Sequence, residues 1–246
     1  MRPLVLSVKR SKFRIDDPTA SIDQPQYRHI RPQILERDNF TCQFCGFRSP
    51  KFQEVHHLDD NHNNSSPDNL VTACPLCHAC NHIALNGDRQ TGRLIWLDPA
   101  LNIGQAQLNN IIRELWLTTL SDHRELRTSA AAMLQRFFTH TLPITQMFGS
   151  DSPLYLGEQM LRMSQEVYDN RASVIKSAGL YFLPNRTGFS RQLDFWAKSK
   201  LNSFPTSQWV NYSKDKVTSW LQNEFKLDGT DDNIARYLKP TETGSK

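Results

Sequence analysis

The chain has 246 residues, 38% of them hydrophobic and 22% charged, which is typical of a folded globular protein and excludes a disordered or fibrous one. No run approaches the roughly 18 apolar residues of a membrane span, and charges follow the apolar start too soon for a signal peptide. The net charge of +4 is modest, so its distribution is more informative than its sum. We expect a cytoplasmic location.

Several short elements are predicted along the first hundred residues. Alternating apolar residues predict a strand over residues 3–8, and Arg31-Pro32 is predicted to open a short helix that runs to Arg37. A strand, a polar loop, a second strand and a helix are expected from residue 55 to residue 82. The apolar run 92–99, bounded by Gly and Pro, predicts a further strand.

Helices are predicted to dominate after residue 100. Apolar residues recur at helical spacing over residues 108–116 and 133–138, and Ser152-Pro153 is a typical opening for a helix that carries apolar residues as far as Val167. Residues 183–188 are expected to interrupt the chain before a last helix over 189–197. These stripes predict buried core rather than cofactor sites.

The last segment has a different composition. Residues 205–246 place Trp209 and Trp220 in a polar background, which predicts an amphipathic helix that docks either on its own chain or on a partner. We therefore divide the chain into an N-terminal module over 1–100, a helical domain over 101–204 and a C-terminal stretch over 205–246. The expected fold class is α+β.

Two Cys-x-x-Cys pairs, at residues 42–45 and 74–77, are the strongest local signal. Two such loops brought together by a fold supply the four thiolates of a structural zinc site, with no position left for water. Disulfides or ordinary buried thiols are the weaker alternative, because we find no signal peptide. The predicted ligands are Cys42, Cys45, Cys74 and Cys77, while Cys80 either replaces Cys77 or fills space as a small apolar residue.

Between and beside these pairs lies a second set of residues, arranged as in an HNH nuclease. In that ββα-metal arrangement a histidine pair supplies one metal ligand and one general base, an asparagine orients the base, and helix histidines complete the metal site. Here His56 would be a ligand, His57 the base and Asn69 the orienting residue, and residues four apart on one helix face would add His78 and His82. Alternatively, Asn69 is a turn residue and the histidine pair lies on a partly exposed strand.

The charge distribution argues against a plain nuclease. Residues 41–100 carry four basic and six acidic side chains, so the module that holds these motifs is net acidic. Phosphate binding depends on Lys and Arg, and Asp59 and Asp60 stand beside the predicted base. Basic residues in the first 40 positions either supply contacts from outside the module or form a solvated surface.

Several blocks resemble the IcmJ (DotN) family of Dot/Icm type IVB secretion systems, which has counterparts in conjugative plasmid transfer systems. They are residues 36–47, the lead from Asn69 into the three cysteines of 74–80, the strand around 94–97 and the break at 183–186. The resemblance extends to about residue 200 and implies an HNH-like zinc fold used as an adaptor, peripheral to the inner membrane and bound to the coupling ATPase. The family is degenerate at the catalytic positions, whereas this chain keeps the whole set.

Two hypotheses follow from these residues. In the first, which we favour, the chain is a non-catalytic adaptor of a coupling complex, and zinc serves only its folding. In the second, it is an endonuclease that cuts or nicks DNA with Mg²⁺, Mn²⁺ or Zn²⁺ in the histidine site and His57 as general base.

Overall fold

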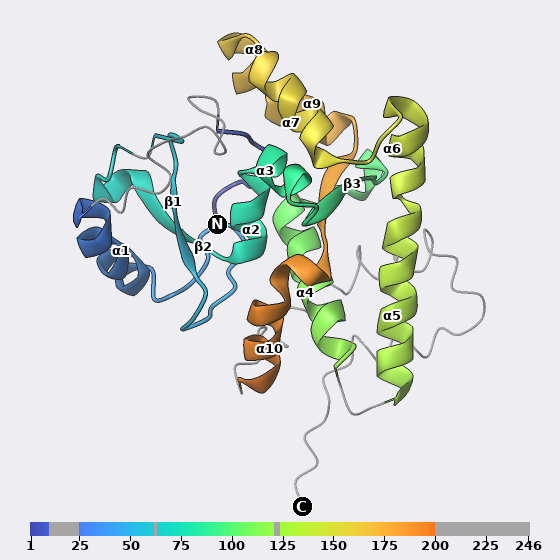
Figure 1. Cartoon of the computed structure of the whole chain (residues 1–246), viewed down its shortest axis with the longest axis horizontal. Helices are drawn as coiled ribbons and strands as arrows, with labels where there is room; N and C mark the ends of the chain where they lie inside the picture. Colours follow the sequence, from blue (N-terminus) through green and yellow to red (C-terminus); the bar gives the residue numbers. More distant parts are fainter. Residues whose placement is uncertain (10–24, 62, 121–123, 200–246) are drawn as a thin grey trace, which may run out of the picture.

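The computed structural model describes residues 1–9, 25–61, 63–120 and 124–199. Within these residues the fold is mixed α/β, mostly helical, with two small sheets. The predicted C-terminal stretch, 205–246, lies outside the described residues. Figure 1 shows the cysteine- and histidine-bearing elements on one side of the molecule and the long helices on the other.

The first sheet and its helices form the N-terminal module. Strand β1 (Glu54–His57) pairs antiparallel with β2 (Leu70–Ala73), so that His57 lies opposite Leu70. Helix α1 (Pro25–Arg37) covers the two strands. After β2, the chain enters α2 (Pro75–Cys80) through Cys74 as N-cap, with proline at the first helical position as its fixed φ favours. Helix α3 (Ile83–Asp88) follows.

The second sheet joins residues that are far apart in sequence. Strand β3 (Gly92–Trp96) pairs antiparallel with β4 (Leu180–Pro184). Gly92 permits this pairing because a Cβ at that position would lie 2.3 Å from the Phe182 ring. The predicted interruption at 183–188 is therefore partly wrong, since its first two residues end a strand whose partner sequence inspection did not identify.

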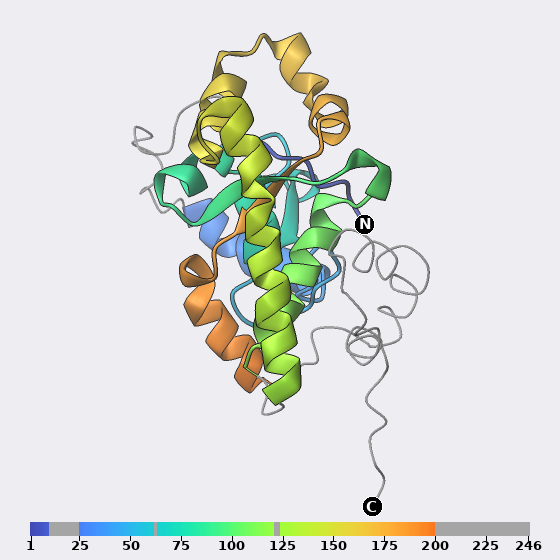
Figure 2. The same ribbon diagram turned by 90° about the vertical axis from the view of Figure 1, so that its right-hand side faces the viewer.

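The remaining helices surround this second sheet. Helix α4 (Gln105–Thr118) packs between the cysteine-bearing elements and α5 (Arg124–Thr139), which continues into α6 (Thr141–Phe148) as the long column visible in Figures 1 and 2. Above them lie α7 (Pro153–Arg162), α8 (Gln165–Asp169) and α9 (Arg171–Ser177), and α10 (Ser190–Lys198) packs against α4. Val167 lies in α8, so the helix predicted to open at Ser152 ends sooner than expected.

A shared core connects the two parts of the sequence. One buried cluster includes Leu76 of α2, Leu108 of α4 and Phe182 of β4. A smaller cluster under α1 holds Ile34, Leu35, Val55 and Leu70. Buried side chains from before and after residue 100 therefore share one cluster, and the division at residue 100 stays a prediction.

Two predictions for the first forty residues need correction. Residues 3–8 form no strand, because their hydrogen bonds go to unrelated groups: the Ser7 N–H donates to the Cys80 carbonyl, and the Val8 N–H donates to the Tyr168 hydroxyl. Helix α1 begins six residues before Arg31 and contains Pro32. Tyr27 and Ile30 pack against the smaller cluster, and these tertiary contacts favour the longer helix.

Candidate metal centres

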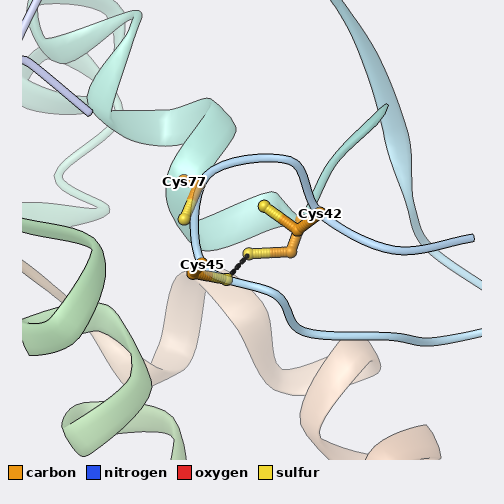
Figure 3. A group of neighbouring side chains, drawn as sticks. Cys42, Cys45 and Cys77 are labelled. Atoms are coloured by element: carbon orange, nitrogen blue, oxygen red, sulfur yellow. Dashed lines mark hydrogen bonds between the residues drawn. The ribbon is translucent and has the colours of Figure 1, made fainter. Parts of the chain in front are cut away.

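The four predicted zinc ligands converge in the structure. Cys42, Cys45, Cys74 and Cys77 are all buried, and their sulfur atoms all lie within 4.8 Å of one another. The Sγ atoms of Cys45 and Cys74 are 3.6 Å apart. Zn–S bonds of about 2.3 Å in a tetrahedron separate the sulfurs by about 3.8 Å, so this spacing fits a zinc ion. Figure 3 shows Cys42, Cys45 and Cys77 pointing toward one another.

Local turns aim the first pair of cysteines inward. The Cys42 N–H donates to the Phe47 carbonyl and the Gly46 N–H donates to the Cys42 carbonyl, each at 2.9 Å. Gly46 has φ of +74°, a left-handed conformation that glycine adopts without strain. The second pair is fixed by α2, where Cys74 is the N-cap and Cys77 lies one turn further on.

Electrostatics favour a cation among these sulfurs. Burial raises the pKa of the Cys74 thiol, and the neighbouring Cys42 and Cys45 raise it further. Burial also raises the pKa of Cys77, again with its neighbours acting in the same direction. Cys45 differs: burial raises its pKa, but hydrogen bonds with Cys42, Cys74 and Cys77 bring the net pKa below the ordinary value. The cluster thus favours one thiolate over several, and full ionisation of the four thiols requires a positive charge among them, which a thiolate-bound divalent metal supplies.

Cys80 lies outside this set. Its thiol donates to the Leu76 carbonyl at 3.3 Å, and burial raises its pKa to about 12, which keeps it protonated near neutral pH. The geometry thus groups Cys77, and not the alternative ligand Cys80, with the other three cysteines.

Three histidines form the second cluster. The ligand nitrogens of His56, His78 and His82 all lie within 4.8 Å of one another. His78 lies in α2, but that helix ends at Cys80, so His82 reaches the cluster as the N-cap residue of α3. The premise that one helix face carries both is therefore wrong, although their rings meet with centroids 4.7 Å apart. Glu54 contacts His78 Nδ1, a carboxylate contact typical of histidines that bind metal through the other nitrogen.

The predicted base and its orienting residue lie apart from these three histidines. His57 stacks on Tyr27 of α1, with centroids 5.6 Å apart, because consecutive strand residues point to opposite faces. Asn69 Nδ2 donates to Asp59 Oδ1 at 2.7 Å and to the Asn64 carbonyl at 2.8 Å. Its side chain therefore holds the loop after β1, and Asp59 in turn acts electrostatically on His57.

The pKa of His57 reflects this position. Burial lowers it, the Asp59 carboxylate raises it in part, and the net pKa lies below the ordinary value. The pKa of Asp59 is itself lowered, because hydrogen bonds from Asn64, Asn61 and Asn69 outweigh its burial. A neutral imidazole near neutral pH is what a general base requires.

Asp60 provides a pH-dependent stability prediction. Its pKa is raised to about 6, chiefly by burial, so its ionisation opposes folding as the pH rises from about 4 through about 6. Asp60→Asn should raise the unfolding free energy by roughly 1–2 kcal/mol at about pH 7.5, after allowance for partial solvent screening, and leave it unchanged near pH 3.5. Asn also tolerates the φ of 56° at this position. Denaturant titrations at the two pH values test this, and an equal effect at both would contradict it.

The structure also adds residues that sequence inspection missed. Asn109 Nδ2 lies 3.5 Å from the sulfurs of Cys77 and Cys80, and the side chain of Arg113 is wholly buried beside the cysteine-bearing loop. Gln105, Asn109 and Arg113 recur at four-residue spacing within the apolar pattern of α4. That polar stripe was the available signal, but nothing in the sequence indicated what it would face.

Comparison with known proteins identifies the family of the chain. Within the part of the chain that the structure describes, no helix has the length and apolar character needed to cross a membrane. A scan against protein-family models matches none. The type 4 apparatus protein DotN of Legionella pneumophila is 31% identical over 180 residues, which cover 72% of this chain and 81% of that protein. The chain therefore belongs to the DotN (IcmJ) family, as its sequence blocks predicted.

Proposed function

We propose that this protein is a structural adaptor in the coupling complex of a type IVB secretion or conjugative transfer system, where it binds the coupling ATPase. The relationship to a type 4 apparatus protein carries this proposal. The net acidic module also supports a protein partner better than DNA. The adaptor would lie in the cytoplasm, associated with the inner membrane through the complex.

Zinc would stabilise this adaptor from within. Cys42, Cys45, Cys74 and Cys77 would hold the ion, and four protein ligands would leave it no open position for chemistry. The order of strand, loop, strand and helix that carries the cysteines and histidines supports an HNH-like ββα-metal module as part of this proposal. In this proposal, residues 1–100 form the module, 101–204 the helical domain and 205–246 a separate C-terminal stretch.

Co-purification tests the adaptor role. The tagged chain, expressed in its own host at native level, is expected to retain the coupling ATPase and about one zinc per chain. Cys77→Ala should lose both, whereas Cys80→Ala, which removes an equally buried thiol, should retain both. A folded, zinc-loaded wild type that retains no subunit of the transfer apparatus would contradict the adaptor role.

The histidine cluster favours one alternative, a metal-dependent endonuclease. A divalent ion held by His56, His78 and His82 would polarise the scissile phosphate. His57 would accept a proton from water, and Asn69 would act through Asp59 rather than on the base directly. The side chain of His57 would then have to serve a substrate on the α1 side of β1.

A plasmid nicking assay decides between the two functions. Supercoiled plasmid would be incubated with purified protein and Mg²⁺, Mn²⁺, Ni²⁺ or Zn²⁺, using His57→Ala as the test variant and the exposed His29→Ala as its control. The adaptor role predicts no nicking with any ion. Nicking that His57→Ala abolishes and His29→Ala keeps would establish the endonuclease.

A further inference from the structure

Helix α4, which follows residue 100 in the sequence, presents polar side chains to the cysteine cluster. Asn109 Nδ2 lies 3.5 Å from the sulfurs of both Cys77 and Cys80. Its Oδ1 accepts from Gln105 Nε2 at 2.9 Å. Gln105 in turn is held by the backbone N–H and carbonyl of Phe182 in β4, each at 2.9 Å. The orientation of Asn109 is thus fixed by the second sheet.

One turn further along α4, the buried guanidinium of Arg113 lies on the same helix face as Asn109. Arg113 is 0% exposed, and its guanidinium carbon lies 3.8 Å from the centroid of the Phe47 ring, in the loop that follows Cys45. Arg113 Nη2 donates to Asn110 Oδ1, and Asn110 Nδ2 donates to the Cys45 carbonyl at 3.0 Å. The guanidinium is therefore packed against the cysteine loop and linked to it by hydrogen bonds.

A wholly buried guanidinium is costly unless negative charge lies nearby. Burial lowers the pKa of Arg113, but the charges of Cys45, Cys74, Glu114 and Cys77 together raise it above its ordinary value. Three of these four groups belong to the cysteine cluster, so the cluster contributes negative potential at the buried guanidinium.

A zinc ion held by four thiolates leaves two units of negative charge in the protein interior. We propose that Arg113 is the buried counter-charge of this metal–thiolate centre, and that α4 supplies its outer shell through Asn109 and Arg113. This inference rests on the proposed zinc site. Arg113 is a positioning and charge-balancing residue here, and it binds no metal itself.

Zinc affinity and thiol reactivity test the role of this charge. Arg113→Met keeps most of the side-chain volume without the charge, Arg113→Lys keeps the charge, and Arg191→Met removes an exposed arginine from α10 as a control. In competition with a chromophoric chelator, Arg113→Met should bind zinc about 10- to 100-fold more weakly than wild type, and Arg113→Lys within about threefold of it. Zinc already holds these cysteines as thiolates, so loss of a nearby positive charge should raise their nucleophilicity, and the zinc-loaded Arg113→Met protein should be alkylated faster at cysteine.

The outcomes separate this inference from the zinc site itself. A wild type that binds no zinc refutes both. A zinc-binding wild type with a folded Arg113→Met variant of unchanged affinity and alkylation rate refutes only the counter-charge. If Arg113→Met does not fold, Arg113→Lys decides: near-normal affinity supports the charge, and a loss beyond about 10-fold refutes it.

Discussion

Replacing Cys77 with alanine is expected to abolish zinc retention and, with it, the cooperative unfolding transition of the protein. Structural zinc contributes an apparent binding free energy on the order of 10–16 kcal/mol, much of which is folding free energy. A site with three cysteines cannot satisfy the tetrahedral preference of zinc with protein ligands alone. The loop that carries Cys42 and Cys45 and the start of α2, which meet through these four sulfurs, would then separate.

Cys80→Ala is the matched control for this variant. Both cysteines are 0% exposed and lie in α2, so each substitution removes one buried sulfur and leaves a similar small cavity. The Cys80 variant should keep about one zinc per chain and lose on the order of 1 kcal/mol of stability. Metal analysis of purified protein and thermal unfolding provide the measurements. Two variants that behave alike would show that Cys77 has no special role as a ligand.

The second large effect is expected at the contact between α3 and α7. A Cβ added to Gly87 would lie 2.1 Å from the backbone nitrogen of Leu154, and one added to Gly157 would lie 2.5 Å from the Cβ of Ala84. The two helices thus meet at a separation that only glycine permits. Because His82 directly precedes α3, this contact also helps to fix the histidine cluster.

Gly87→Ala should therefore destabilise the protein. Alanine gains up to about 1 kcal/mol over glycine in a helix, but overpacking against a backbone atom costs roughly 1–3 kcal/mol or more. The clash is expected to outweigh the gain and lower the melting temperature by about 5 °C or more. Gly104→Ala is the control, because its nearest neighbour would be Gln107 Oε1 at an ordinary 3.5 Å. A Gly87 variant as stable as wild type would refute this account of the helix contact.

The cysteine spacing alone predicted that these four thiols would converge. Short Cys-x-x-Cys loops fix the separation of their own sulfurs, so a local pattern carries most of the geometry. Sequence could not choose between Cys77 and Cys80, because both lie on α2 and the choice depends on what packs around each sulfur. The structure groups the sulfur of Cys77 with those of Cys42 and Cys45 in the first cysteine loop. The sulfur of Cys80 lies against Leu76 and Asn109 instead.

The histidine cluster was predicted for a reason that was partly wrong. An uninterrupted helix through His78 and His82 would have placed both on one face. The chain instead leaves the helix at Asn81, and the Ile83 N–H donates to the Ser7 carbonyl of the N-terminal segment. The two histidines meet because a distant part of the chain stabilises the bend between α2 and α3.

By itself, the sequence determined the family, the largely helical composition and the four cysteines that converge. These depend on local spacing and periodicity, which are properties of the linear sequence. The pairing of β3 with β4, the bend before His82 and the placement of Arg113 beside the cysteines were decided only by the tertiary structure. Each of these brings together groups that are distant in sequence, and only the burial of a shared core determines which distant groups meet.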